Sequence, residues 1–267
     1  MRIYFADSSF NKLELNPFNN NMRYDSSWIM IKLLESASFK QYTGGGKKGV
    51  FQLILTKKNM DWEYRIFDFI QYEKECGNNI ILAIEQKDYE KAKETYSMHN
   101  YMDNFLRFYE KKVLMHSTTK ENYSAIKSDG CVKSWNILKK ENKINEEKPI
   151  GDLLGDPLDY RDYIMFSNGG NSTERVISSK QKGYIEMDID KPYIAGARLY
   201  FDCEKIANDG LLVRDGAHLK VKQCLPLEKY LLWAATPYEL GICEESTPRI
   251  FSDKADSMFE EMAGIKL

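Results

Sequence analysis

Closely spaced cysteines are missing from this chain. Its five cysteines are far apart, and no two form a Cys-x-x-Cys pair, which excludes a zinc ribbon or a thioredoxin-like redox site. Only three histidines are present and none has a cysteine close by, so we expect no metal site. The N-terminal residues lack the apolar core of a secretory signal, so we expect reduced thiols in a cytoplasmic protein. The cysteines are Cys76, Cys131, Cys203, Cys224 and Cys243.

Long apolar runs and an excess of one charge are also missing. The longest apolar runs, Ile80–Ile84 and Leu231–Ala235, are far shorter than the ~20 residues that span a bilayer, so we expect no membrane segment. The 38 basic and 40 acidic residues give a net charge of −2, which excludes a globally basic nucleic-acid binder but not a local basic face. Hydrophobic residues make up 43% of the chain, enough for a globular fold.

The first 112 residues predict a mixed α/β module. We expect strands at Arg2–Ala6 and Ile80–Ile84, and a helix over Asp88–Tyr96. The apolar residues within Asp25–Phe39 are spaced as in a helix that begins at Asp25 or Ser26.

A glycine-rich segment, Thr43–Gly49, follows in the sequence. A phosphate-binding P-loop would continue with serine or threonine and open a helix, whereas here a second lysine and an expected strand, Val50–Thr56, come next. This segment therefore predicts a hairpin or loop. Further on, the aromatic residues of Tyr101–Lys112 have helical spacing, which predicts a helix with one buried aromatic face.

A second unit is expected over residues 113–267. It begins with a short apolar strand, and Thr118 and Glu121 have the spacing of a capping box. A helix is expected over Lys120–Ser128, and Gly130 suits the left-handed cap at its C-terminal end. Several short strands separated by turns follow, which predicts a compact twisted sheet or split barrel.

Four segments of this second unit form a recognisable series. Val113–Gly130 combines an apolar strand, His-Ser-Thr, a helix and a glycine, and Tyr163–Ser167 is a second apolar strand. Ala197–Asp202 has the form Arg-x-x-x-Asp, and His218–Leu231 contains Leu-Pro-Leu followed by Tyr-Leu. The series resembles the ADP-ribosyltransferase fold of poly(ADP-ribose) polymerases, DarT-type DNA ADP-ribosyltransferases and RNA 2′-phosphotransferases. The resemblance covers about Lys112–Thr236.

The resemblance implies an α+β protein of two parts. Residues 1–112 would be an N-terminal α/β module, and residues 113–267 an ADP-ribosyltransferase-like split β-sheet domain. In that family NAD is the substrate and lies in a cleft of the sheet. By position, His116, Ser117 and Thr118 correspond to the residues that hold NAD.

Further site residues are implied in the same way. An aromatic side chain on the second strand stacks on nicotinamide in the family, and Tyr163 or Phe166 corresponds to it. Ser178 and Ser179 are expected to line the same cleft, and the alternative is a polar strand or turn. For His116 the alternative is an ordinary residue at the end of a strand.

His218 stands where the family has a catalytic glutamate. The carboxylate orients the nicotinamide ribose and stabilises an oxocarbenium-like transition state, and an imidazole cannot supply that negative charge. Three interpretations stay open. Another carboxylate substitutes, with Asp215 and Glu186 the nearest; or His218 is a general base, because histidine titrates near neutral pH; or the site is inactive. The chain also has Ser117 for the usual glycine and Met165 at the position of a motif tyrosine.

The resulting hypothesis is an NAD-dependent mono-ADP-ribosyltransferase that acts on a macromolecule, in a toxin or phage-defence setting. DNA, RNA and protein are all open as acceptors, and the lysine pairs would suit a nucleic acid if they converge around the cleft. The alternative is a catalytically degenerate protein of this fold that binds a nucleotide or nucleic acid without chemistry.

Overall fold

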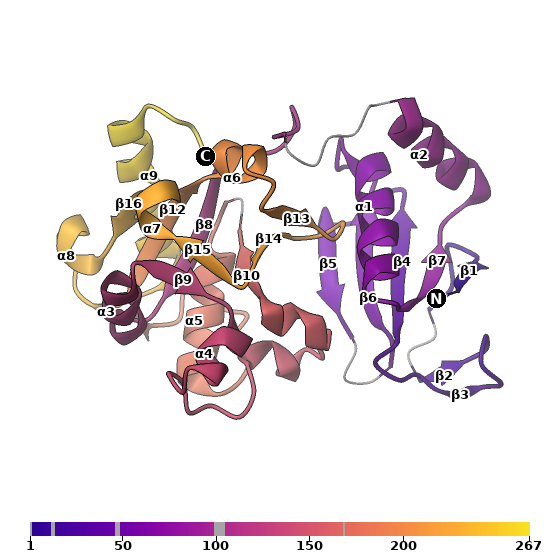
Figure 1. Cartoon of the computed structure of the whole chain (residues 1–267), viewed down its shortest axis with the longest axis horizontal. Coiled ribbons are helices and arrows are strands. Elements are labelled where there is room, and N and C mark those ends of the chain that lie inside the picture. The colour runs from indigo at the N-terminus through magenta and orange to yellow at the C-terminus, as the bar shows by residue number, and fades with distance from the viewer. Residues whose placement is uncertain (1, 12–13, 46–48, 99–104, 168) are drawn as a thin grey trace. The chain divides into compact units, whose positions relative to one another are not determined.

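The computed structural model describes residues 2–11, 14–45, 49–98, 105–167 and 169–267. These residues form both helices and β-sheets, which confirms the predicted α+β fold (Figure 1). No helix among them is both long enough and apolar enough to cross a membrane.

Tertiary contacts divide the chain into two compact units. Unit 1 comprises Met1–Met102, Gly151–Tyr160 and Arg214–His218. Unit 2 comprises Asp103–Ile150, Arg161–Val213 and Leu219–Leu267. Two short segments from the later part of the chain, one of which carries His218, are therefore part of unit 1.

Unit 1 is built on a five-stranded sheet in the order β1-β7-β4-β6-β5. The first four strands are parallel, and β5 is an antiparallel edge strand beside β6. Of these, β4, β6 and β7 are mostly buried on both faces, which explains their nearly continuous apolar sequences. The strands are β1 (Ile3–Ala6), β4 (Trp28–Leu34), β5 (Gln41–Gly44), β6 (Phe51–Thr56) and β7 (Asn79–Ala83).

The two faces of this sheet are covered differently. Helix α1 (Trp62–Glu75) lies across one face and packs against α2 (Gln86–Met98) (Figure 1). On the other face, aromatic side chains of the N-terminal segment, which includes the small hairpin of β2 (Leu15–Asn16) and β3 (Met22–Arg23), pack against buried residues of the sheet. The aromatic residues of that segment are Phe10, Phe18 and Tyr24.

The helix predicted over Asp25–Phe39 is wrong. Residues Trp28–Leu34 form β4, which lies between β7 and β6. A short run in which almost every residue is apolar fits a strand buried on both faces as well as a helix, and the β-branched Ile29 and Ile31 favour the strand.

The helix predicted over Tyr101–Lys112 is also wrong as far as the structure describes it. Residues 105–112 contain no helix, and the Phe108 side chain is 86% exposed rather than buried. Residues 101–104 lie outside the described residues. The glycine-rich segment joins β5 and β6, an antiparallel pair, so the predicted hairpin is confirmed, although residues 46–48 lie outside the described part.

Unit 2 is built on two three-stranded sheets. One has the order β16-β12-β8 and the other β10-β14-β13. Among the described residues they meet at one antiparallel bridge, where the backbones of Met115 and Ser167 exchange hydrogen bonds of 2.8 and 2.9 Å. Beyond this bridge the sheets separate. The strands are β8 (Val113–Thr118), β10 (Tyr163–Phe166), β12 (Ala197–Asp202), β13 (Leu212–Arg214), β14 (Leu219–Lys222) and β16 (Leu231–Ala235).

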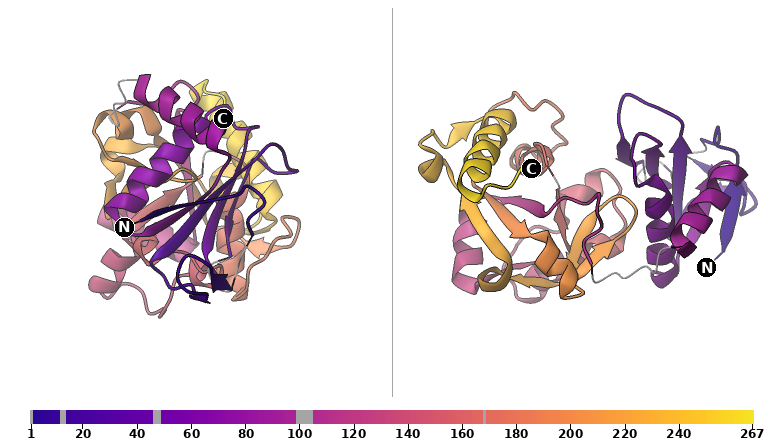
Figure 2. Two further views of the ribbon diagram at one scale, coloured as in Figure 1. Left: turned by 90° about the vertical axis from the view of Figure 1, so that its right-hand side faces the viewer. Right: turned by 90° about the horizontal axis from the view of Figure 1, so that it is seen from above.

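The β16-β12-β8 sheet has an apolar core on each face. Leu114, Leu199 and Phe201 point to the face shared with β10 and β14. Met115 and Tyr200 point to the other face, which α5 (Ser172–Lys182) and α9 (Pro248–Ala263) cover (Figure 2). The alternation along β8 therefore decides which side chains face the second sheet.

The helix after β8 forms as expected, with one correction at its start. Helix α3 spans Lys120–Asp129, and Gly130 follows in the left-handed conformation with φ 67°. Thr119, not Thr118, is the N-cap, and its hydroxyl accepts a hydrogen bond from the Asn122 backbone. Thr118 is still paired in β8 with Ala197, so its side chain belongs to the strand.

Short elements complete the chain. They are β9 (Cys131–Lys133), α4 (Trp135–Lys140), η1 (Ile150–Leu153), η2 (Leu158–Asp162), β11 (Tyr193–Ile194), α6 (Cys203–Asn208), β15 (Cys224–Pro226), α7 (Leu227–Tyr230), α8 (Pro237–Leu240) and β17 (Glu245–Ser246).

Candidate functional site

His116 lies where the two sheets of unit 2 separate. It follows the bridging residue Met115 on β8, and its Nδ1 atom is 3.1 Å from the carbonyl oxygen of Met165 on β10. The Phe166 ring is edge-on to the imidazole, with 6.0 Å between ring centroids. One histidine thus contacts both sheets next to the bridge that joins them.

The hydrogen bond to Met165 fixes the tautomer of His116. A carbonyl oxygen only accepts, so Nδ1 carries the proton and Nε2 is the acceptor of the neutral ring. Burial lowers the pKa of His116, and the Met165 carbonyl offsets only part of that effect. Near neutral pH the side chain is therefore an uncharged hydrogen-bond acceptor at Nε2, suited to a ligand hydroxyl.

Ser117 and Thr118 point to opposite faces of the sheet. Thr118 shares the face of His116 and is buried. The backbone just before β12 approaches it closely, since a Cβ on Gly196 would lie 2.1 Å from the Thr118 carbonyl oxygen. Ser117 faces the helices instead, where its hydroxyl donates to the Glu174 carboxylate.

The two aromatic residues of β10 are also separated. Phe166 is buried beside His116 in the core between the sheets. Tyr163 is three residues earlier and therefore points to the other face of the strand. There the ammonium group of the buried Lys220 lies 4.6 Å from the Tyr163 ring centroid. The structure thus brings Phe166, and not Tyr163, together with His116.

Ser178 and Ser179 lie on α5, so the interpretation as a polar strand or turn is wrong. Both are buried on the helix that covers the face opposite to His116. Ser179 accepts a hydrogen bond from the Glu186 backbone at 2.9 Å, and the Ser178 hydroxyl has no hydrogen-bond partner among the described residues. Neither serine is brought together with His116.

A buried ionic cluster lies behind Ser117. Arg198 of β12 is fully buried, and its guanidinium donates at 2.7 Å to Glu174 of α5 and at 2.8 and 3.0 Å to Asp256 of α9. It also donates to the Thr173 hydroxyl at 2.9 Å. Tyr200 completes the cluster, with its hydroxyl 2.8 Å from Asp256.

The charges of this cluster depend on one another. Burial opposes the charged form of Arg198, yet Glu174 and Asp256 raise its pKa. Burial raises the pKa of Asp256, and Arg198 offsets part of that rise. The Arg-x-x-x-Asp pattern singled out Arg198 in the sequence. No local motif indicated that Glu174 and Asp256 would be its partners.

His218 lies in unit 1, in the turn Arg214–His218 that directly precedes β14. The fully buried Asp215 carboxylate accepts from the Ala217 backbone at 3.0 Å, from the His218 backbone at 2.7 Å and from His218 Nδ1 at 3.2 Å. The Tyr160 hydroxyl lies 3.4 Å from the same Nδ1 atom. A carboxylate oxygen only accepts, so Nδ1 is the donor in this contact.

Other residues of unit 1 hold this turn. Arg65 of α1 donates to the Gly216 carbonyl at 3.3 Å, and Gln41 of β5 donates to the Ala217 carbonyl at 2.9 Å. Nearby, burial raises the pKa of Asp156 to about 6, although His218 partly lowers it. The Asp156 carboxyl thus lies close enough to His218 for their charges to interact.

The two carboxylates predicted to replace the glutamate have different settings. Asp215 is the partner of His218. Glu186 closes the loop after α5: the Asp188 backbone, Lys191 and Lys182 lower its pKa to about 2. The negative charge of Glu186 is therefore paired with lysines within and beside that loop.

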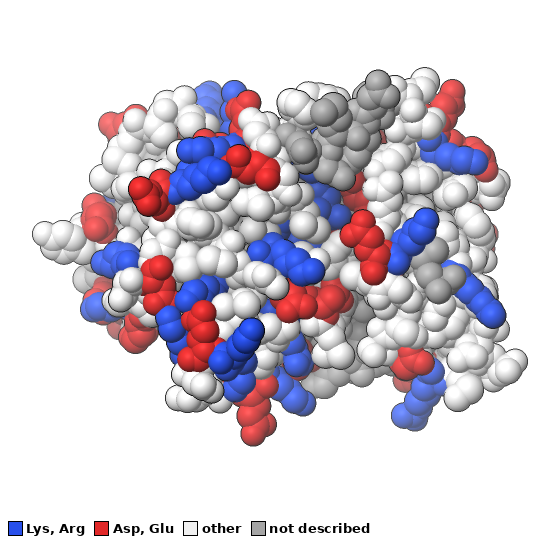
Figure 3. Space-filling view, viewed as in Figure 1, with Lys and Arg blue, Asp and Glu red and all other residues white. Residues whose placement is uncertain are grey.

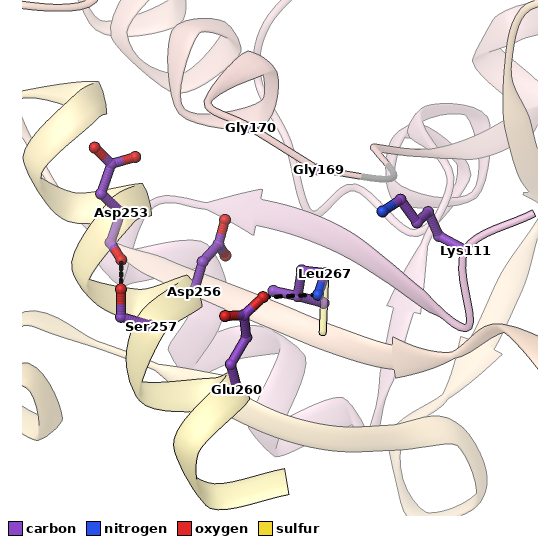
Figure 4. A pocket seen from close by; sticks show the side chains of 8 residues that line it. All are labelled: Lys111, Gly169, Gly170, Asp253, Asp256, Ser257, Glu260 and Leu267. Carbon is purple, nitrogen blue, oxygen red and sulfur yellow. Dashed lines mark hydrogen bonds between the residues drawn. The ribbon is translucent and has the colours of Figure 1, made fainter. Parts of the chain in front are cut away.

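A cavity of about 570 Å³ lies on the α9 side of unit 2 (Figure 4). Three carboxylates of α9, from Asp253, Asp256 and Glu260, stand along one wall, and Lys111 lies across from them. The Gly169–Gly170 turn and Leu267 also line the cavity. Asp256 thus lines the cavity and also contacts the buried Arg198.

The face of the molecule drawn in Figure 3 carries basic and acidic side chains side by side. Two lysines of α5, Lys180 and Lys182, form ion pairs with Glu146 and Glu186. Among the described residues, no three potential metal ligands of the histidine, cysteine, aspartate or glutamate type form a group.

Comparisons with models of protein families, with curated proteins and with solved structures found no match for this chain.

Proposed function

We propose that this protein is an NAD-dependent mono-ADP-ribosyltransferase that modifies a macromolecule and binds NAD where the sheets of unit 2 separate. In such a transfer the bond between nicotinamide and C1′ of its ribose breaks, and nicotinamide leaves with the electron pair. The acceptor atom then bonds to C1′, and its proton passes to a base. NAD is consumed as a substrate.

One observation carries the proposal. His116 presents a neutral Nε2 acceptor beside Phe166 at the separation of two sheets, and the resemblance assigns the grip on a ribose hydroxyl to this histidine. The fixed tautomer supports this role because the acceptor atom is available before any ligand arrives. Phe166 is then the aromatic residue closest to the nicotinamide end, with Thr118 on the same face of β8.

The transfer also needs a base, and the resemblance makes His218 the candidate for it. By the resemblance His218 stands at the position of the catalytic glutamate, and its Nδ1 atom is 3.2 Å from the Asp215 carboxylate. A neutral acceptor, such as a hydroxyl or an amide, must lose a proton in the transfer. Histidine therefore takes over proton removal, while the electrostatic part of the glutamate's role is absent.

The test uses NAD labelled in its adenylate part. Purified protein is incubated with this NAD in separate tubes that contain DNA, RNA or cell extract, and His116→Ala is assayed in parallel. We expect label on one class of macromolecule, lost in the variant. If wild-type protein neither binds nor consumes NAD, the proposal is wrong.

Nucleotide binding without chemistry is the second candidate. The carboxylates of unit 2 that could replace the catalytic glutamate favour this candidate, because they already have partners. Glu174 is bound to Ser117 and Arg198, and Glu186 forms an ion pair within its own loop. Under this function NAD binds with clear affinity, but no tube shows label transfer or release of nicotinamide. The same experiment therefore separates the two functions.

A further inference from the structure

The buried cluster connects four elements of unit 2 behind the strand that carries His116. Ser117 of β8 and Arg198 of β12 are directly opposite each other in the sheet, so their side chains share one face. Glu174 reaches this pair from α5, and Asp256 reaches it from α9. The His116 side chain points to the other face of the same strand.

Arg198 also holds the segment that follows β10. Its Nη2 atom donates to the Gly170 carbonyl at 2.9 Å, in the turn between β10 and α5. Because Ser167 at the start of this turn forms the bridge to Met115, the turn directly follows a strand of the second sheet. One guanidinium therefore contacts groups on both sides of the place where the sheets separate.

A cluster of this kind is a costly way to stabilise a core. Desolvation of buried charges consumes much of their mutual attraction, and well-packed apolar residues of similar size often stabilise a core equally well. The neighbours on this face, Met115 and Tyr200, belong to such an apolar core. The directional hydrogen bonds of the cluster supply what apolar contacts lack, a fixed position for each group.

We propose that Glu174 is a positioning residue for the ligand site at His116. The carboxylate fixes Ser117 from behind and thereby fixes the backbone and ring of His116 on the front. Its ion pair with Arg198 keeps that guanidinium directed at the Gly170 carbonyl. The inference rests on the proposed function for the identity of the ligand, NAD, but the positioning of His116 is independent of it.

The main variant is Glu174→Gln, which keeps the size of the side chain and removes its charge. A misplacement of about 1 Å is enough to cost large factors in function, so we expect NAD to bind at least about tenfold more weakly. Glu186→Gln is the matched control, because Glu186 is also a buried glutamate of unit 2 with ion pairs but lies outside the cluster. We expect it to bind NAD as the wild type does.

A second readout separates positioning from stability. The ¹⁵N shifts of the His116 ring report which nitrogen is protonated, and they are measured without ligand, well below the melting temperature. We expect the Nδ1–H form in the wild type and in Glu186→Gln, and a mixture of tautomers in Glu174→Gln. A residue that only stabilised the core would lower the melting temperature and leave the ring signals unchanged.

Ser117→Ala provides the test if Glu174→Gln fails to fold. It removes the hydrogen bond to Glu174 and leaves the ion pair with Arg198 in place. We expect the same change in the His116 ring signals, to a smaller extent. Wild-type ring signals in the folded variants would overturn the inference. If wild-type protein does not bind NAD, the proposed function is wrong, and the ring signals still decide the role of Glu174.

Discussion

The surroundings of His116 and His218 show two ways to fix a histidine. Both rings use Nδ1 to contact an oxygen, a backbone carbonyl for His116 and a buried carboxylate for His218. The neutral carbonyl leaves burial as the largest influence on His116 and lowers its pKa. The carboxylate of Asp215 instead accepts the Nδ1 hydrogen of His218 at 3.2 Å. The two rings are thus held by partners of different kinds; under the proposed function the first histidine binds the ligand and the second removes a proton.

The largest expected effect concerns the support behind His116. Arg198→Leu leaves Glu174 and Asp256 as buried carboxylates without their counter-charge. We expect unfolding of unit 2 to become easier by about 3–5 kcal/mol. Urea unfolding of the variant and the wild type checks this. A loss below about 1 kcal/mol would show that the cluster contributes little to the fold.

Next in size is the pH dependence near His218. Burial raises the pKa of Asp156 in the folded state to about 6, above the unfolded value of 3.8. The folded state thus favours the protonated carboxyl. The resulting contribution to the free energy of unfolding is fully present below pH 3.8 and is lost as the pH rises through 6. By linkage it amounts to roughly 3 kcal/mol.

Asp156→Asn tests this dependence. The amide remains neutral at every pH, so we expect the variant to be more stable than the wild type above pH 6 and similar to it at pH 4. Urea unfolding at both pH values measures the difference. An equal difference at the two pH values would contradict the raised pKa.

Asp215→Asn makes the setting of His218 more like that of His116. The amide oxygen can still accept from the turn backbone, but the negative charge next to Nδ1 is gone. If His218 is the base, we expect the rate of transfer to fall about 10²-fold or more and NAD binding to stay unchanged. Single-turnover transfer over a range of pH values measures this. Equal losses in binding and rate would instead indicate a displaced turn.

The smallest effect concerns the helix that follows His116. Thr119→Ala removes the N-cap of α3, and we expect a loss of about 1 kcal/mol in the stability of unit 2. Thermal unfolding checks the value. NAD binding serves as the control: it should not change, because the cap belongs to the helix, whereas His116 is held by β8 and Met165.

Local patterns in the sequence predicted much of the fold. The strand at Val113, the helix from Lys120 and the left-handed Gly130 each depend on neighbours within a few residues, and all three are confirmed. The strand at Trp28–Leu34 was mistaken for a helix because a short run of almost only apolar residues fits both structures. The choice was made by β6 and β7, which pair with it from more than ten residues away in the sequence.

The sequence pointed to only some of the residues around His116. The sequence suggested His116, Ser117, Thr118 and Phe166 by their positions in a series of motifs. Glu174, which contacts Ser117, carried no signal because it lies 57 residues away in the sequence.

The amino-acid sequence by itself determined the α+β composition, the strand that ends in His-Ser-Thr and the helix that follows it, because these depend on periodicity and on end caps that act over short distances. Only the tertiary structure decided which nitrogen of His116 accepts, which aromatic residue accompanies it and which carboxylates are buried beside Arg198. Each of these depends on groups from different strands and helices, and their hydrogen bonds form only where folding brings them within about 3 Å.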